Sequence, residues 1–190
     1  MKTFLVVDDH VVVRSGIKLL LLEIFKPAEI YEASDGESAL KKLLERGYDL
    51  IVLDIQMPGT DTLSLMQLII KKYPDARVLI FSMGAENIYA KRFLKAGARG
   101  FISKEAPMKE IVKAVGRLLN NQRYISDALA ELLAKNSFES KTENSFNRLS
   151  AREFEIATLL LTVQTISHIS SALKSRYQPR APTKQECLRN

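Results

Sequence analysis

The sequence predicts an α/β protein built on an open, doubly wound parallel sheet of five strands. Up to about residue 120, short β-branched apolar runs alternate with stretches of helical period, which is the pattern of consecutive βα units. Two of these runs, LIVLD at 50–54 and RVLIF at 77–81, are almost uninterruptedly apolar, as strands covered by helices on both faces must be. Right-handed crossovers between such strands place the helices on both faces of one sheet.

Five strand-like runs are followed in turn by five helical stretches. TFLVV at 3–7 predicts the first strand and is followed by a helix over 10–25. A second strand at 30–33 precedes a helix over 36–46, and LIVL at 50–53 precedes one over 61–72. RVLIF at 77–81 is followed by a helix over 87–96, and GFI at 100–102 by a helix over 107–120. We therefore expect one α/β domain over 1–121.

Beyond residue 121 the sequence predicts a linker and a smaller helical unit. YISDALAELL at 124–133 is compatible with one more short helix, and the polar stretch 135–148 is typical of a linker, so 122–148 would join two domains. In the last part, 149–190, Ser150 and Glu153 have capping-box spacing, and Ile156, Leu159 and Leu160 follow at helical positions. A second helix is expected over 165–173.

Composition excludes several classes of protein. No apolar run approaches the ~18 residues needed to span a bilayer, so we expect a cytoplasmic protein without membrane contact. The lone cysteine, Cys187, allows neither an internal disulfide nor a thiolate zinc site. The net charge of +6 is concentrated at the end, because 174–190 carries +4 and leaves +2 for the rest. The basicity is therefore a property of the tail.

Polar side chains stand at four of the five predicted strand ends. Asp8 and Asp9 follow the first strand, Asp54 the third and Ser82 the fourth, and Lys104 comes just after the fifth. In an open α/β sheet, ligands bind beyond the carboxyl ends of the strands. An acidic pair after a strand is by itself more often a helix cap or a solvated turn, but three clustered carboxylates repel one another unless a cation intervenes. Hard oxygen ligands indicate Mg²⁺, or Mn²⁺.

Four segments carry a resemblance to a known family: VVDDH at 6–10, IVLDIQMPGTD at 51–61, VLIFS at 78–82 and GARGFISKEAP at 97–107. Their order and spacing over about 1–120 resemble the response-regulator receiver domain of two-component phosphorelays, in the subgroup with a LuxR-type (NarL-type) DNA-binding domain. The resemblance implies a flavodoxin-like fold with strand order 2-1-3-4-5.

The resemblance also implies the roles of the acidic residues. Asp54 would be the phospho-acceptor, taking a phosphoryl group from a histidine of a sensor kinase. Asp9 and Asp54 with the backbone carbonyl of Gln56 would hold Mg²⁺, and Asp8 would reach the ion directly or through water. Carboxylate attack on phosphorus needs neutralisation of the equatorial oxygens, which the ion and the Lys104 ammonium can supply.

Two further residues are implied as the switch that reports phosphorylation. Ser82 would donate a hydrogen bond to a phosphoryl oxygen, and in the family this pull is coupled to an aromatic residue on the fifth strand, here Phe101, which has no hydroxyl and can report only by packing. The readout expected from the resemblance is formation of a homodimer on phosphorylation.

The C-terminal segment resembles part of a DNA-binding unit. LSAREFEIATLLLTVQTISHISSAL at 149–173 is similar to the first two helices of the LuxR-type helix-turn-helix, after which the family has a recognition helix. Here KSRYQPRAPTKQECLRN follows, with Pro179 and Pro182 where a helix interior is required. Reading codons 176–190 one nucleotide earlier permits the family's S-x-x-T-x-x-x-H-x-x-R-I/M-x-x-K series, so we hypothesise a frameshift near codon 174. No DNA-contacting residue can be named.

Three alternatives stay open beside a phosphorylation-controlled transcription regulator. One is a phospho-receiver without sequence-specific DNA binding, because the recognition helix is missing. Another is a hydrolase with Asp54 as nucleophile, but phosphatases of the haloacid-dehalogenase type need an Asp where Gln56 stands. A flavodoxin-like cofactor binder is disfavoured because two carboxylates would repel a phosphate. No enzyme activity beyond the receiver's own phosphorylation and dephosphorylation is expected, and no special role for His10 or His168.

Overall fold

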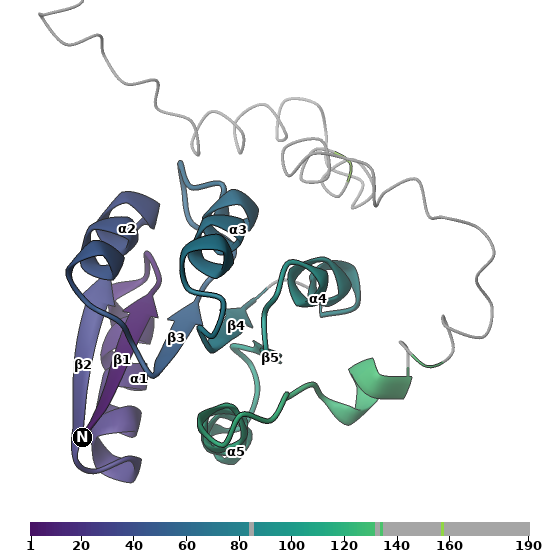
Figure 1. Ribbon diagram of the computed structural model, residues 1–190. Helices are drawn as coiled ribbons and strands as arrows, with labels where there is room; N and C mark the ends of the chain where they lie inside the picture. The colour runs from purple at the N-terminus through teal and green to yellow at the C-terminus, as the bar shows by residue number, and fades with distance from the viewer. Residues whose placement is uncertain (84–85, 132–133, 135–156, 158–190) are drawn as a thin grey trace, which may run out of the picture.

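The chain, described by a computed structural model over residues 1–83, 86–131, 134 and 157, alternates five strands with five helices up to residue 119 (Figure 1). The predicted elements of this part are confirmed, with ends that differ by at most two residues. The strands are β1 Lys2–Val7, β2 Ala28–Ala33, β3 Leu50–Leu53, β4 Val78–Ser82 and β5 Gly100–Ser103. The helices are α1 Val11–Ile24, α2 Gly36–Glu45, α3 Thr62–Lys72, α4 Glu86–Lys95 and α5 Met108–Leu119.

The strands form one parallel sheet in the order β2-β1-β3-β4-β5, as the resemblance implied. Their register aligns the carboxyl ends, since Val7 lies opposite Leu53 and Ser82 opposite Ser103. The sheet hydrogen bonds continue one residue further, where the amide of Asp54 donates to the carbonyl of Val7 at 2.9 Å. The polar residues that follow the strands therefore come together at one edge.

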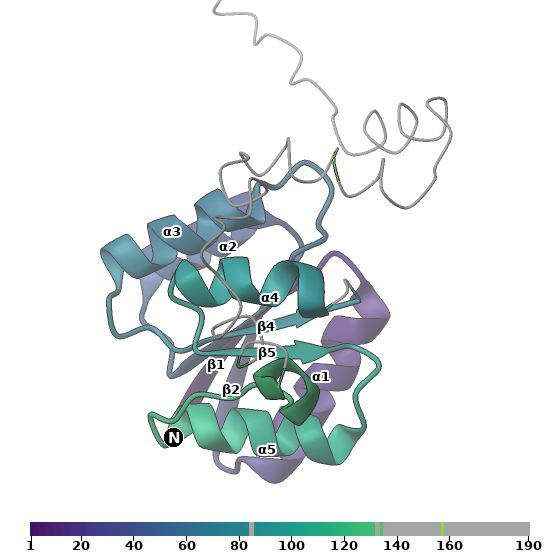
Figure 2. The same ribbon diagram turned by 90° about the vertical axis from the view of Figure 1, so that its right-hand side faces the viewer.

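Helices cover both faces of the sheet, and the sheet divides the core into two layers. α2, α3 and α4 lie on one face and α1 and α5 on the other (Figure 2). Alternate residues of each strand point to opposite faces, so that Leu5 and Val7 pack with the first set of helices and Phe4 and Val6 with the second. All four residues of β3 are buried, which explains why its sequence lacks polar alternation.

Aspartates begin two of the helices and fix the loops that precede them. Asp35 accepts a hydrogen bond from the amide of Ser38 at the start of α2, and the Ser38 hydroxyl completes a capping box. Asp61 caps α3 through the amide of Ser64. These caps satisfy backbone donors that the first helical turn cannot pair internally, and the second one fixes the end of the loop that follows Asp54.

The chain folds back onto the sheet after α5. Tyr124 forms an isolated parallel bridge with Gly100 of β5, and a short helix begins only at residue 127. The prediction of helix from residue 124 is therefore wrong for its first three residues. Tyr124 and Leu129 are both buried in the core, so packing continues past residue 121. The predicted linker at 135–148, the helices of 149–173, His168 and the basic tail lie outside the described residues, apart from residue 157.

None of the helices in the described ranges combines the length and the apolar character that crossing a membrane requires.

Candidate functional site

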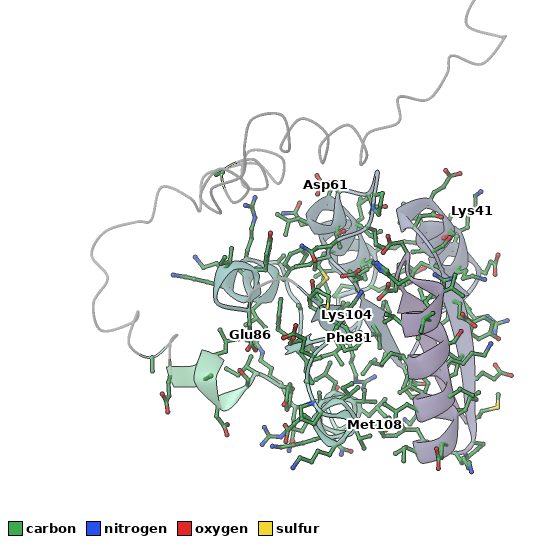
Figure 3. All side chains as sticks on the ribbon, turned by 180° about the vertical axis from the view of Figure 1, so that it is seen from behind. Lys41, Asp61, Phe81, Glu86, Lys104 and Met108 are labelled. Carbon is green, nitrogen blue, oxygen red and sulfur yellow. The ribbon has the colours of Figure 1, made fainter. Side chains whose placement is uncertain are left out.

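The carboxyl edge of the sheet brings together the acidic residues of two inner strands and the lysine after β5. The Nζ of Lys104 lies 2.6 Å from Oδ2 of Asp8 and 2.8 Å from Oδ2 of Asp54. All three side chains are at least 95% buried. Figure 3 labels Lys104 among the elements of the sheet and its helices. One ammonium therefore bridges two buried carboxylates that are 46 positions apart in the chain.

Asp9 lies in the same cluster, with its carboxylate more open to solvent than that of Asp8. Its Oδ1 lies 2.9 Å from Nδ1 of His10, but this buried oxygen accepts no hydrogen bond from the described residues. The His10 ring also lies 3.2 Å from Oδ1 of Asp8, and its amide donates to the same oxygen. The prediction of no special role for His10 missed this contact, because ligand spacing was sought only among His and Cys.

Two contacts hold the ends of the acidic loops. The amide of Gln56 donates to Oδ1 of Asp54 at 3.2 Å. The guanidinium of Arg14, on the first turn of α1, donates to the backbone carbonyl of Asp8 at 2.6 Å and lies 3.6 Å from the carboxylate of Glu32. Sequence reasoning missed Arg14, since a side chain bonded to a backbone carbonyl six residues away leaves no pattern in the sequence.

The two predicted switch residues lie on adjacent strands, Ser82 at the carboxyl edge of β4 and Phe101 of β5 opposite Ile80. Ser82 is fully buried at the end of β4, and its carbonyl accepts the amide of Lys104 at 3.0 Å. Phe101 of β5 is also fully buried, within the core layer beneath α2, α3 and α4. The backbone amide of Phe101 donates to the carbonyl of Tyr124. A backbone hydrogen bond therefore links Phe101 directly to the segment that follows α5.

Burial and the ion pairs act in opposite directions on the two titratable partners. Burial raises the pKa of the Asp54 carboxyl above its usual value, although the Lys104 ammonium opposes that shift. Burial alone would lower the pKa of Lys104, but the carboxylates of Asp54 and Asp8 outweigh it and raise that pKa. The lysine is therefore held in its charged form while Asp54 ionises less readily than a free carboxylate.

The donor set fits a hard divalent cation. Ligand atoms of Asp8, Asp9, His10 and Asp54 all lie within 4.8 Å of one another. Three carboxylates and one ammonium, the His10 ring not counted, leave a formal charge of −2 at a largely buried position. Such an excess is costly in a medium of low dielectric constant. A dication would neutralise it, and the buried Oδ1 of Asp9 is free of hydrogen bonds from the described residues to ligate one.

A parallel sheet in this order, with clustered carboxylates and a buried lysine at its carboxyl edge, defines a receiver-type domain. The sequence pattern of the response regulator receiver domain matches residues 4–116, and the chain belongs to this family.

Known relatives agree with this assignment. The chain is 37% identical over 170 residues to the response regulator GacA of Pseudomonas viridiflava, a match that covers 89% of this chain and 79% of GacA. A two-component response regulator of the LuxR family from Aurantimonas sp. SI85-9A1 is 29% identical, with a TM-score of 0.67 over 73% of this chain and 99% of that one. The response regulator TrrA of Thermotoga maritima, solved in complex with Mg²⁺-BeF, is 35% identical, with a TM-score of 0.56 over 62% and 99% of the two chains.

Proposed function

We propose that this response regulator accepts a phosphoryl group on Asp54 from a histidine of a sensor kinase. The observation that carries the proposal is the position of Asp54, whose carboxylate is buried at the end of the central strand and bonded to Lys104. A nucleophilic carboxylate needs a positive charge beside it when phosphoryl oxygens approach, and Lys104 supplies one within 2.8 Å.

The transfer makes and breaks one bond to phosphorus. An oxygen of Asp54 attacks the phosphorus of the phosphohistidine, the N–P bond breaks and an O–P bond forms. The electron pair stays on the histidine nitrogen, which takes up a proton from solvent. The Lys104 ammonium stabilises negative charge on the phosphoryl oxygens. Positioning of the carboxylate and the phosphoryl group accounts for most of the remaining rate enhancement.

The resemblance to receiver domains implies the metal ligands, and the cluster of Asp8, Asp9 and Asp54 supports them. Asp9 and Asp54 with the backbone carbonyl of Gln56 would hold Mg²⁺ or Mn²⁺, and Asp8 would reach the ion directly or through water. When bound, the ion supplies positive charge against the phosphoryl oxygens. The relative TrrA binds Mg²⁺-BeF, which supports this assignment.

Phosphorylation would be reported through Ser82 and Phe101. The Ser82 hydroxyl would donate to a phosphoryl oxygen, and β5, which pairs with β4, would carry the resulting displacement to the Phe101 ring. The added charge is about −1.5 to −2 at neutral pH, and it shifts the conformational equilibrium only as far as its contacts differ between the two states. Formation of a homodimer is the expected consequence.

Phosphorylation is tested with the full chain and a small-molecule phosphodonor such as acetyl phosphate. We expect a mass increase of one phosphoryl group that requires Mg²⁺ and is lost in Asp54→Asn. The matched control is Asp61→Asn, because Asp61 is an exposed helix cap in the same loop and asparagine caps equally well. Labelling that persists in Asp54→Asn would show that the acceptor is another residue.

The proposed output is regulation of transcription through DNA binding, as in response regulators of the LuxR family. The second candidate is a phospho-receiver without sequence-specific DNA binding, favoured by Pro179 and Pro182 in the segment where a recognition helix is expected. We propose no enzymatic activity on other substrates. Mobility shifts of promoter fragments by the full chain, with and without phosphodonor, separate the two: sequence-specific shifts support the first, and their absence the second.

A further inference from the structure

We propose that residues 122–131, called the strap below, position Lys104 by bracing strand β5, and that docking of the strap and loading of Asp54 favour one another. The inference rests on the proposed function and deepens it, because it assigns a role in the phosphoryl site to a segment that follows α5 and contacts none of the three carboxylates. It makes Tyr124 a positioning residue.

The first observation is that the strap pairs with an edge strand. In the sheet, β5 has only β4 as a neighbour. Its other edge is met by Tyr124, whose amide donates to the carbonyl of Arg99 at 3.0 Å and whose carbonyl accepts the amide of Phe101 at 3.1 Å. Gly100 lies between these two bonds, with no side chain to hold the strap away. The strap therefore occupies the hydrogen-bonding edge that β5 would otherwise leave open.

Side chains fasten the strap to the two helices on either side. The Tyr124 hydroxyl donates to Oε2 of Glu110 on α5 at 2.6 Å, and the Ser126 hydroxyl donates to Oε2 of Glu86 on α4 at 2.8 Å. Leu129 is 2% exposed and belongs to the same core layer as Phe101. Figure 2 shows the short helix of the strap between α4 and α5, and Figure 3 shows Glu86 on the side of α4 that faces it.

The strap lies at the margin of the sheet, and a hollow lies beside part of it. A cavity of about 350 Å³ lies beside it, lined by residues of the strap, of the end of β5 and of α5, including Ile102, Pro107, Lys113 and Asp127. The strap is held by these hydrogen bonds and by the buried side chains of Tyr124 and Leu129, with the cavity beside part of it. A short segment joined to the edge of a sheet by one isolated bridge opens at a lower free energy than the sheet itself, so docking of the strap is reversible.

The path from the strap to the phosphoryl site is short. Lys104 stands three residues after Phe101, and its amide is fixed by the carbonyl of Ser82. A docked strap keeps β5 in register and so keeps the ammonium against Asp54 and Asp8. A phosphoryl group on Asp54 needs that same ammonium, and coupling between two binding events is reciprocal. Loading of the site must therefore stabilise the docked strap.

Amide hydrogen exchange on the full chain tests this coupling, with Mg²⁺ and beryllium fluoride as the probe. We expect loading to slow exchange by severalfold at the amides of Phe101, Tyr124 and Ala130. If exchange changes around Asp8, Asp54 and Lys104 while the strap amides exchange as before or faster, the coupling is refuted and the proposed function stands. If no residue of the site responds to the probe, the proposed function fails and the inference fails with it.

Variants test the same coupling in the other direction. Tyr124→Phe removes one bond to Glu110, and Leu129→Ala removes the buried anchor, so both should weaken beryllium fluoride binding in Mg²⁺, Leu129→Ala by about fivefold or more. The control is Tyr48→Phe, which loses a hydroxyl bonded to the carbonyl of Lys42 on α2. Unchanged affinity in folded Leu129→Ala would overturn the proposal. A variant that does not fold leaves the exchange measurement on the unaltered chain to decide.

Discussion

The Nζ of Lys104 lies 2.8 Å from Oδ2 of Asp54, and the two side chains are 5% and 1% exposed. Each of these buried ions has lost most of its hydration. Removing one of them therefore leaves the other without a partner and destabilises the folded state. The Lys104 ammonium also pairs with the carboxylate of Asp8, so one positive charge faces two negative charges. The carboxylate of Asp9 adds a third negative charge to the cluster. The stability of the domain and the chemistry of its site therefore depend on the same charges.

Replacing Lys104 with methionine should strongly destabilise the domain. Two buried carboxylates would lose their only ion-pairing ammonium among the described residues, a change that costs about 3–5 kcal/mol. Urea denaturation at pH 7 in the presence of EDTA measures this loss. Lys41→Met is the control, since its ion pair with Glu37 is exposed and worth about 0–1 kcal/mol. Equal losses in the two variants would contradict a buried role for Lys104.

Magnesium should stabilise the folded chain, and EDTA should reverse the effect. An ion that binds only the folded state at 100 times its dissociation constant adds about 2.7 kcal/mol to the free energy of unfolding. Thermal denaturation with and without MgCl₂ gives the shift. Asp9→Asn should lose most of it, because one of the clustered carboxylates is gone, whereas Asp75→Asn, an exposed position outside the site, should keep it. A full shift in Asp9→Asn would exclude Asp9 as a ligand.

The cap of α2 should make stability depend on pH in the acidic range. The amide of Ser38 donates to Asp35 and, with the neighbouring hydroxyls, lowers the pKa of this carboxyl from its ordinary value of 3.8 although burial opposes the shift. The folded state therefore binds this proton less tightly than the unfolded state. The stabilisation is complete above pH 3.8 and is lost as the pH falls through the lower folded pKa.

Two variants separate the charge of Asp35 from its role as a cap. Asp35→Ala should cost about 1 kcal/mol at pH 7, while Asp35→Asn should keep most of the cap and lose the acidic pH dependence. Urea denaturation of the three proteins between pH 3 and pH 7 provides the comparison. An asparagine variant with the same pH profile as the unaltered chain would assign the dependence to another carboxyl.

Gly100→Ala should destabilise the domain and disturb the strap. A Cβ at this position would lie 3.0 Å from the carbonyl oxygen of Tyr124 and 3.0 Å from Cδ1 of Leu79. Overpacking of this kind costs about 1–3 kcal/mol. Gly116→Ala in α5 is the opposite case, because nothing lies within 4 Å of its Cβ and alanine favours a helix by about 1 kcal/mol. Urea denaturation should therefore give changes of opposite sign, and a stabilised Gly100→Ala would refute the close approach.

The sheet was predictable because its strands carry an unambiguous signal. The apolar run 50–53 has no polar alternation, and the structure buries all four of its residues between two layers of helices. The positions of Asp8, Asp54 and Lys104 followed from the same logic, since parallel strands bring the residues after their carboxyl ends to one edge. The site was therefore predictable as far as it is built from strand ends.

The contacts that the sequence did not predict are tertiary contacts, which leave no periodic pattern along the chain. Tyr124 is a single aromatic residue after a helix, and whether it continues a helix or pairs with Gly100 is decided by the open edge of β5, which belongs to another part of the chain. The contacts of Arg14 with the Asp8 carbonyl and of His10 with two carboxylates are likewise fixed by tertiary geometry. Local patterns carry no information about such partners.

The strand order gives the two charges of the site different mechanical supports. Asp8 and Asp54 follow β1 and β3, each of which has a neighbouring strand on both sides, whereas Lys104 follows β5 at the margin of the sheet. The two carboxylates thus follow strands that are paired on both edges, and the ammonium follows a strand with one neighbouring strand. Residues beyond α5 can therefore change how firmly Lys104 is held while the geometry of the carboxylates stays constant.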